Sequence, residues 1–260
     1  MTGALEGITV VVTRPAAQAG RFLDLARAAG ARCIAYPTLQ IDPVALDPAT
    51  VSRMRSRQWD WAIFTSANAV EAALGQLPAP LAARHAAIGR ATARALESRG
   101  IAVDARPASA SSEGLLDLLP EFGELAGCGV LLVKGSGGRE LLRDAVAARG
   151  AEVLELAVYR RSAVNPTGAA AAGLHSAITG EDRVVIAVTS AETLQSLLDH
   201  VAASDAPRLR SQTLLVPGPR VAAAAASLGW LGPIVAAATA EDEAMFAALA
   251  RLAAGSLPAA

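Results

Sequence analysis

Hydroxyl-bearing, glycine and cationic residues follow the apolar runs of this sequence, where each run passes into a helix-forming segment. The residues at these junctions include Thr13, Arg14, Thr65, Ser66, Asn68, Gly89, Thr92, Ser112, Lys134, Gly135, Arg139, Thr189 and Ser190. Helix N-termini and turns that expose backbone N–H groups bind anions. The junctions therefore predict an anion-binding site, built locally by a chain whose formal net charge is only −1.

Each of these residues also has a structural interpretation. Ser and Thr at a helix start commonly cap the helix, glycines commonly form turns, and an arginine is commonly a solvated surface residue. Tyr159, at the end of another apolar run, is either a packed aromatic residue or a proton donor. The residue types alone leave both interpretations open.

The constellations that serve hydrolases and metalloenzymes are missing from these junctions. They contain no paired carboxylates, no Cys/His dyad and no Ser/His/Asp set. The three histidines, His85, His175 and His200, stand in no metal-ligand spacing, so we expect no metal centre. Cys33 and Cys128 each adjoin an apolar run, which indicates buried free thiols rather than a disulfide.

The segment from Lys134 to Arg139 reads Lys-Gly-Ser-Gly-Gly-Arg and resembles a phosphate cradle. It lacks the Gly-Lys-Ser/Thr ending of a P-loop, so its nucleotide signal is weak. A two-lobed protein that binds a phosphate or nucleotide ligand therefore stays open as an alternative function.

The elements that must position these residues are strands that each feed a helix. The segment from Ile63 to Val70 combines an apolar strand, a Thr-Ser cap and the start of an amphipathic helix. The segment from Val184 to Leu194 is a near copy, in which Thr189 stands in the place of Thr65. A repeat this far apart indicates a duplicated domain rather than a short structural repeat.

Two further junctions recur in the same order, because Gly218 repeats the Gly89 junction and Lys134 repeats the Arg14 junction. We predict an α/β fold of two similar domains, each a parallel sheet with helices on both faces. Either each half of the chain folds on itself, or the chain crosses between the domains at two extended connectors that contain tyrosine.

Weaker local signals complete the predicted elements. Residues 37–49 carry three prolines, so we expect a connector there rather than a strand or helix. Residues 101–105 are a strand candidate, and residues 115–119 are a helix candidate that follows Ser112 and Glu113.

Length and composition limit the class of protein. The chain has 260 residues, of which 53% are hydrophobic, enough for two domains with a core each. A net charge near zero excludes the basic field that holds nucleic acid or an anionic membrane. No apolar run approaches the roughly 20 residues that span a bilayer, and residues 1–6 lack the pattern of a signal peptide. We expect a cytoplasmic protein.

Taken in order, these segments resemble the uroporphyrinogen-III synthase family over almost the whole chain. The segments that carry the resemblance are Val12–Pro15, Asp60–Val70, Ala87–Gly89 with Thr92, Ser112–Leu115, Lys134–Gly135 with Gly138–Arg139, and Val158–Arg161. The order and spacing of the segments are specific to the family, although no single segment is. Residues 217–219 read Pro-Gly-Pro where family members commonly carry a hydroxyl, so no side-chain contact is expected there.

The resemblance implies flavodoxin-like domains and a chain that crosses between them twice. Residues 1–36 and 162–260 would form one domain, and residues 40–157 would form the other. The connectors at residues 36–40 and 158–161 would make a two-segment hinge.

The resemblance also implies a lyase that acts on hydroxymethylbilane in the cleft between its domains. It would remove water from this linear tetrapyrrole and close it to uroporphyrinogen III with ring D inverted, a step of porphyrin and heme biosynthesis that uses no cofactor. We hypothesise that Tyr159 donates a hydrogen bond to the departing hydroxyl, while the junction residues bind the acetate and propionate groups. We expect a monomer that contacts the hydroxymethylbilane-producing enzyme only transiently.

Overall fold

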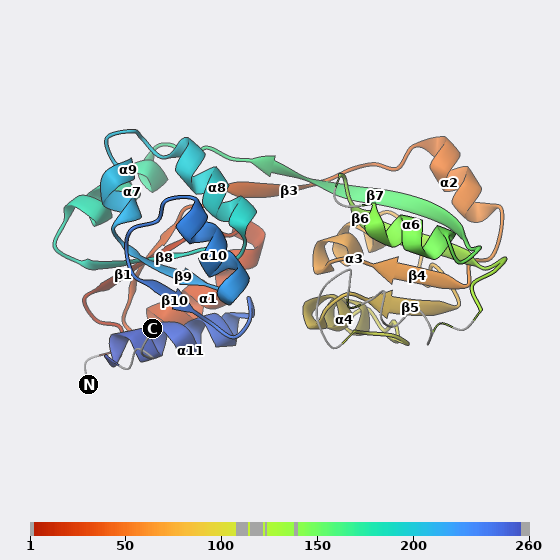
Figure 1. The fold of residues 1–260 in the computed structure, drawn as a ribbon, viewed down its shortest axis with the longest axis horizontal. Helices are drawn as coiled ribbons and strands as arrows, with labels where there is room; N and C mark the ends of the chain where they lie inside the picture. The colour runs from red at the N-terminus through yellow and green to blue at the C-terminus, as the bar shows by residue number, and fades with distance from the viewer. Residues whose placement is uncertain (1–2, 108–113, 115–121, 123, 138–139, 256–260) are drawn as a thin grey trace. The chain divides into compact units, whose positions relative to one another are not determined.

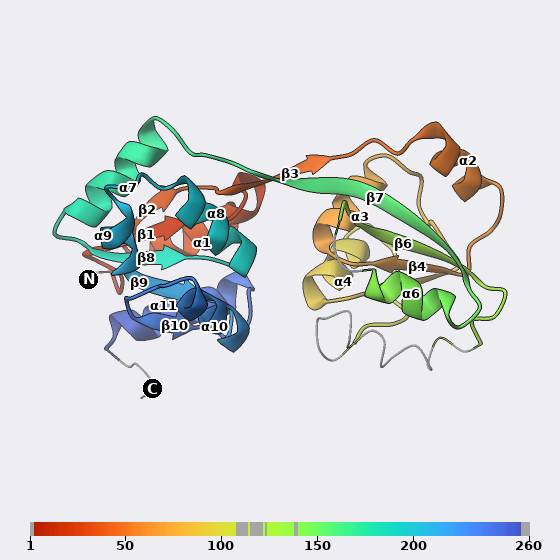
Figure 2. The ribbon, with the colours of Figure 1, turned by 45° about the horizontal axis from the view of Figure 1, so that its top comes forward.

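The computed structural model describes residues 3–107, 114, 122, 124–137 and 140–255. The chain divides into two compact units, and each contains a five-stranded sheet with helices packed on it (Figure 1, Figure 2). Unit 1 consists of residues 1–40 and 162–260, and unit 2 consists of residues 41–161.

The sheet of unit 1 is parallel throughout, with the strand order β10-β9-β8-β1-β2. Its strands are β1 (Ile8–Val12), β2 (Arg32–Ala35), β8 (Arg183–Ala187), β9 (Thr213–Val216) and β10 (Ile234–Ala236). Within unit 1 the first strand lies between the second and the third, which is the flavodoxin-like order. The central strand β1 is a continuous Ile-Thr-Val-Val-Val run that is buried along its length, as expected for a strand covered on both faces.

Two layers of helices cover this sheet. α1 (Ala16–Ala28) and α11 (Asp242–Ala253) pack on one face, where Phe22 and Met245 share a core with the strands. α7 (Ala169–Thr179), α8 (Ala191–His200), α9 (Ala206–Arg210) and α10 (Pro219–Ser227) cover the other face. The sheet is therefore the middle layer of a three-layer α/β unit.

The sheet of unit 2 has the strand order β3-β7-β6-β4-β5. Its strands are β3 (Leu39–Pro43), β4 (Trp61–Phe64), β5 (Arg84–Ala87), β6 (Gly129–Gly135) and β7 (Glu152–Ala163). β5, β4, β6 and β7 are parallel to one another. β3 runs antiparallel to β7, because backbone bonds join Thr38 to Val164 at one end and Val44 to Val158 at the other.

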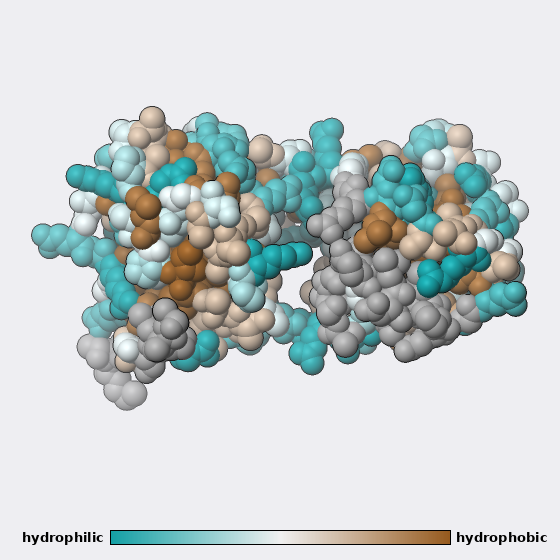
Figure 3. Space-filling view, in the orientation of Figure 1, coloured by the Kyte–Doolittle hydropathy of each residue, from teal (hydrophilic) through white to brown (hydrophobic). Residues whose placement is uncertain are grey.

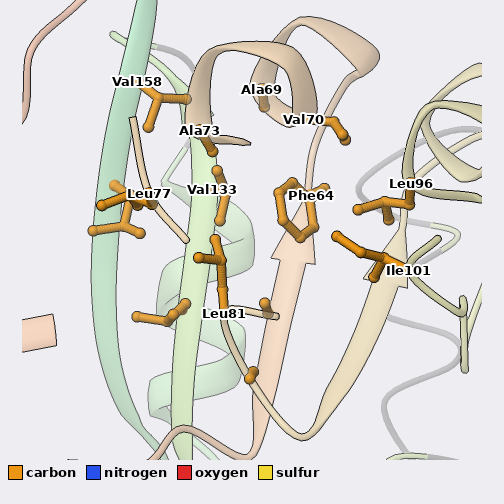
Figure 4. Close-up of a cluster of buried hydrophobic side chains, with 14 of the residues drawn as sticks. Phe64, Ala69, Val70, Ala73, Leu77, Leu81, Leu96, Ile101, Val133 and Val158 are labelled. Carbon is orange, nitrogen blue, oxygen red and sulfur yellow. The ribbon is translucent and has the colours of Figure 1, made fainter. Parts of the chain in front are cut away.

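Helices also cover both faces of this sheet. α3 (Ala67–Leu74) and α4 (Arg90–Glu97) pack on one face together with α2 (Pro48–Arg55), and α6 (Leu141–Ala147) packs on the other. Figure 4 shows Phe64 of β4 among Val70 of α3, Leu96 of α4 and Val133 of β6.

The two sheets are built from equivalent parts taken from opposite halves of the chain. In unit 1, β1 from the start of the chain pairs with β8, the strand before Thr189. In unit 2, β6 pairs with β4, the strand before Thr65. Because β1 and β6 begin the two repeats, each sheet combines the first strand of one repeat with later strands of the other. The chain therefore crosses from unit 1 to unit 2 and back.

The structure differs from two local predictions. Residues 39–43 form β3 inside the segment predicted as a connector, and Pro43 is tolerated because it ends an edge strand. In the strand candidate at residues 101–105, only Ala105 bridges to Ala86 of β5. The helix candidate at residues 115–119 lies outside the described residues.

Among the described residues, no helix is both long and apolar enough to cross a bilayer. The face shown in Figure 3 carries hydrophilic side chains over both units.

Candidate active site

Tyr159 lies at the carboxyl edge of the parallel sheet in unit 2, where ligands of open α/β sheets collect. Along β6 and β7 the ladder pairs Lys134 with Ala157 but Gly135 with Tyr159, so one residue of β7 is skipped. This irregularity places Val158 and Tyr159, although consecutive, in the same core cluster. It thereby turns the tyrosine ring toward the α3 side of the sheet.

Gly135 makes room for this ring. A Cβ on residue 135 would lie 2.7 Å from Cζ of Tyr159 and 3.0 Å from its hydroxyl oxygen. The next residue, Ser136, donates its backbone N–H to the Tyr159 carbonyl oxygen at 2.6 Å. With these neighbours the tyrosine is only 2% exposed.

The side chains of Ser66 and Arg161 contact the Tyr159 hydroxyl. Ser66 Oγ lies 3.1 Å from it, and Ser66 Oγ also accepts the Ala69 N–H as the N-cap of α3. Arg161 Nη2 donates a long hydrogen bond of 3.4 Å to the same hydroxyl oxygen, and Arg161 Cζ lies 5.9 Å from the centroid of the Tyr159 ring. One helix cap and one cation therefore converge on the phenol oxygen.

Lys134 is held by an ion pair. Its Nζ lies 2.9 Å from Glu155 Oε1 of the neighbouring strand β7, and its side chain is 13% exposed. A substrate carboxylate would have to take the place of Glu155 to reach this ammonium. Ser112 and Arg139, the other predicted site residues of this region, lie outside the described residues.

The remaining predicted site residues of unit 2 follow β4 and β5. Thr65 donates its backbone N–H to Val133, and Thr65 and Asn68 are both half-buried. Gly89 is the N-cap of α4 and supplies no side-chain cap, while Thr92 in the first turn is 4% exposed. At this second helix start, the accessible groups are backbone groups rather than the Thr92 hydroxyl.

Unit 1 holds the equivalents of these residues. Thr189 follows β8, and Ser190 caps α8 by accepting the Thr193 N–H at 3.1 Å, as Ser66 caps α3. Arg14 is 8% exposed, pairs with Asp242 and donates to the Ala240 carbonyl oxygen at 2.9 Å. Arg14 is therefore engaged within unit 1, and a ligand would have to compete with Asp242.

The comparison with protein families decides among the functions left open by the sequence. The family model described as Uroporphyrinogen-III synthase HemD matches residues 21–247. The chain belongs to the uroporphyrinogen-III synthase family. The nucleotide- or phosphate-binding alternative is thereby set aside.

Relatives and solved structures agree with this family. The chain is 30% identical to uroporphyrinogen-III synthase of Escherichia coli K12 over 93% of its length and 100% of the relative, and 33% identical to that of Salmonella typhimurium with the same coverage. In fold it is similar to a mutant uroporphyrinogen III synthase of Thermus thermophilus, with a TM-score of 0.61 at 24% identity, over 96% of this chain and 100% of that one. The synthase of Helicobacter pylori 26695 gives a TM-score of 0.59 at 17% identity, over 95% and 100% of the two chains. The family's two-domain α/β fold is thus confirmed.

Within this synthase-family fold, the structure brings some predicted residues together and separates others. Tyr159, Ser66 and Gly135 are in direct contact, while Arg14, Thr189 and Ser190 belong to the other unit. The sequence interpretation missed Arg161 as a site residue. The strand continues past Tyr159, and residues two apart on a strand share a face, so that spacing was the available signal.

No group of histidine, cysteine, aspartate or glutamate side chains that could hold a metal ion occurs among the residues described.

Proposed function

We propose that the carboxyl edge of the unit 2 sheet is where this chain carries out the activity of its family. That activity is uroporphyrinogen-III synthase, a hydro-lyase reaction of tetrapyrrole biosynthesis. The substrate implied by the family is hydroxymethylbilane. It loses water from its hydroxymethyl end and closes into a macrocycle with the last ring inverted.

The reaction places few demands on covalent chemistry. The C–O bond breaks with its electron pair going to oxygen, and the positive charge left behind is delocalised over the pyrrole as an azafulvene cation. The enzyme must supply a proton to the leaving oxygen, hold the two chain ends in place and exclude water. Closure without inversion competes, so orientation determines which isomer forms.

The observation that carries the proposal is the hydrogen-bond arrangement at Tyr159. A hydroxyl has one proton to donate, and Ser66 Oγ already accepts the Ala69 N–H. When Ser66 donates to the phenol oxygen, as Arg161 does, that oxygen acts as an acceptor toward both. The proton of Tyr159 is then available to the departing hydroxyl of the substrate.

The carboxylates of the substrate would be bound by the strand-end residues of the sheet. In unit 2 we assign this role to Thr65, Ser66, Asn68, Gly89, Thr92, Lys134 and Gly135, together with Ser112 and Arg139. In unit 1 we assign it to Arg14, Thr189 and Ser190. Helix starts support these assignments, because their N–H groups and positive dipole ends favour anions. Lys134 and Arg14 would contribute by exchanging their present partners, Glu155 and Asp242, for substrate carboxylates.

The test is an isomer analysis with the purified protein. Hydroxymethylbilane is generated in situ, and the oxidised products are separated chromatographically into type I and type III isomers. We expect type III to predominate. If a folded sample formed only the type I isomer, at the rate seen without protein, the proposed function would be refuted.

A monomeric state and a cytoplasmic location stay predictions. Sedimentation velocity at several concentrations tests the first, and cell fractionation tests the second.

A further inference from the structure

We propose that Arg161 is a positioning residue for Tyr159, holding the phenol oriented for proton donation and stabilising the phenolate that forms when the proton leaves. This inference rests on the proposed role of Tyr159 and adds a residue that the sequence had not assigned to the site.

The geometry places a positive charge beside the reacting oxygen. Arg161 Nη2 lies 3.4 Å from the Tyr159 hydroxyl, and Arg161 Cζ lies 5.9 Å from the ring centroid. Arg161 is exposed, whereas Tyr159 is 2% exposed. The guanidinium therefore borders the buried phenol on the same face of β7, within the range of a cation–π contact.

The direction of the hydrogen bond gives Arg161 its function. A guanidinium only donates, so its bond fixes the phenol oxygen as acceptor and leaves the phenol proton for another acceptor. Ser66 can accept the phenol proton or donate to the phenol, and the cation favours donation because both donors stabilise negative charge on the oxygen. Without Arg161, Ser66 could instead accept the proton that the substrate needs.

The step is balanced in atoms and electrons. The C–O bond of the hydroxymethyl group breaks, its electron pair leaves with oxygen, and the Tyr159 proton converts the leaving group to water. The phenolate then lies beside the Arg161 cation. The proton released when the macrocycle closes restores the phenol, so the reaction consumes no further reagent.

The neighbouring Arg160 provides a matched control. It is one residue away on the same strand, on the opposite face, and its Nε lies 3.7 Å from Asp42. Arg160→Gln removes the same charge from the same strand without touching the phenol.

The kinetic experiment compares Arg161→Gln, Arg161→Lys and Arg160→Gln in the type III assay. We expect Arg161→Gln to lower kcat by about 10- to 100-fold with KM nearly unchanged, because the lost interaction matters most in the transition state. Arg161→Lys retains a cation and should recover most of kcat, and Arg160→Gln should match the parent. A raised KM with unchanged kcat in Arg161→Gln would overturn the proposal, since it would show that Arg161 binds a substrate carboxylate.

A spectroscopic experiment tests the same contact without turnover. The chain has only two tyrosines, so Tyr36→Phe leaves Tyr159 as the sole source of the near-ultraviolet phenolate absorbance. In that background, the midpoint of the absorbance titration should lie about one pH unit or more higher with Arg161→Gln than with Arg160→Gln. Identical midpoints would overturn the role of Arg161. Full turnover by Tyr159→Phe would refute the role of Tyr159 on which this inference rests. It would leave the synthase function itself intact, because that function is tested by the isomer that the parent protein forms.

Discussion

Gly135 and Tyr159 face each other across the ladder between β6 and β7, so closely that residue 135 has no room for a side chain. The nearest atom to a Cβ there would be Cζ of Tyr159, the carbon that bears the hydroxyl. The glycine is required by this close approach. The position of the phenol is therefore set by a residue on the neighbouring strand.

Gly135→Ala should displace the phenol. The new methyl group would overlap the ring, so we expect kcat to fall by about tenfold or more, and the free energy of unfolding to fall by about 1–3 kcal/mol. Gly20→Ala is the control, because no atom of the described part of the chain lies within 4 Å of a Cβ there, and its activity should match the parent. Full activity of Gly135→Ala, measured in the type III assay, would contradict the assigned position of Tyr159.

Ser66 both caps α3 and contacts Tyr159, and a second N-cap residue, Asp47 of α2, allows these two roles to be told apart. Ser66→Ala and Asp47→Ala each remove an N-cap, of α3 and α2 respectively, so each should lower the free energy of unfolding, Ser66→Ala by about 1 kcal/mol. Of these two cap residues, Ser66 is the one that contacts Tyr159, so Ser66→Ala alone should lower kcat. Urea unfolding and the type III assay on the same samples make the comparison. Equal kcat values for the two variants would mean that Ser66 acts only as a cap.

His85 should make the protein sensitive to mild acid. Burial lowers the pKa of His85 below its ordinary 6.5, and the nearby Asp104 carboxylate opposes that shift. The pKa of His85 is therefore lower in the folded state than in the unfolded state, so keeping this histidine neutral contributes to the stability of the fold. That contribution is fully present above about pH 6.5 and is lost as the pH falls from there through the folded-state pKa. The pKa values of the Asp47 and Glu152 carboxyls are also lowered, but these groups affect the pH dependence of stability only below their ordinary pKa values of 3.8 and 4.5, which is outside this window.

The check is urea unfolding at about pH 7.5 and about pH 5.5, with His85→Leu as the comparison. The Nε2 atom of His85 is buried and has no hydrogen-bond partner among the described residues, so leucine should be tolerated at neutral pH. We expect the parent to lose more stability than the variant on acidification. Equal losses would show that His85 does not carry the acid sensitivity.

Glu155 should compete with the substrate for Lys134. Glu155→Gln leaves the ammonium without its carboxylate partner, so we expect KM for hydroxymethylbilane to fall a few-fold, and Lys134→Met to raise it. The size of both effects should shrink with added salt, since the pair is partly exposed. If Glu155→Gln raised KM instead, the ion pair would be holding Lys134 in its binding position.

The sequence predicted the local units because their signals are local. The Thr-Ser junctions at Thr65 and Thr189 predicted a strand followed by a capped helix, and Ser66 and Ser190 do cap α3 and α8. The pairing of β1 with β8 joins distant segments. The hydrophobic periodicity left open whether the chain crosses between the two units, and only the family resemblance indicated that it does.

Apart from Arg161, the features of the site that the sequence did not predict depend on partners distant in sequence. Lys134 and Arg14 were predicted as available cations, but their carboxylate partners are brought to them by folding. The ladder irregularity that turns Tyr159 into the core also has no sequence signal, since it arises from the pairing of two strands. Sequence patterns report periodicity and caps, whereas these features need the assembled sheet.

The most direct measurement is the rate of type III formation by Tyr159→Phe, with folding confirmed by circular dichroism. Phenylalanine keeps the ring beside Gly135 and removes only the hydroxyl, and with it the proton for the leaving group. Since general acid catalysis contributes at least about 10²-fold, we expect kcat to fall by that factor or more. A variant that forms type III uroporphyrinogen at the parent rate would contradict the assignment of Tyr159 as the proton donor.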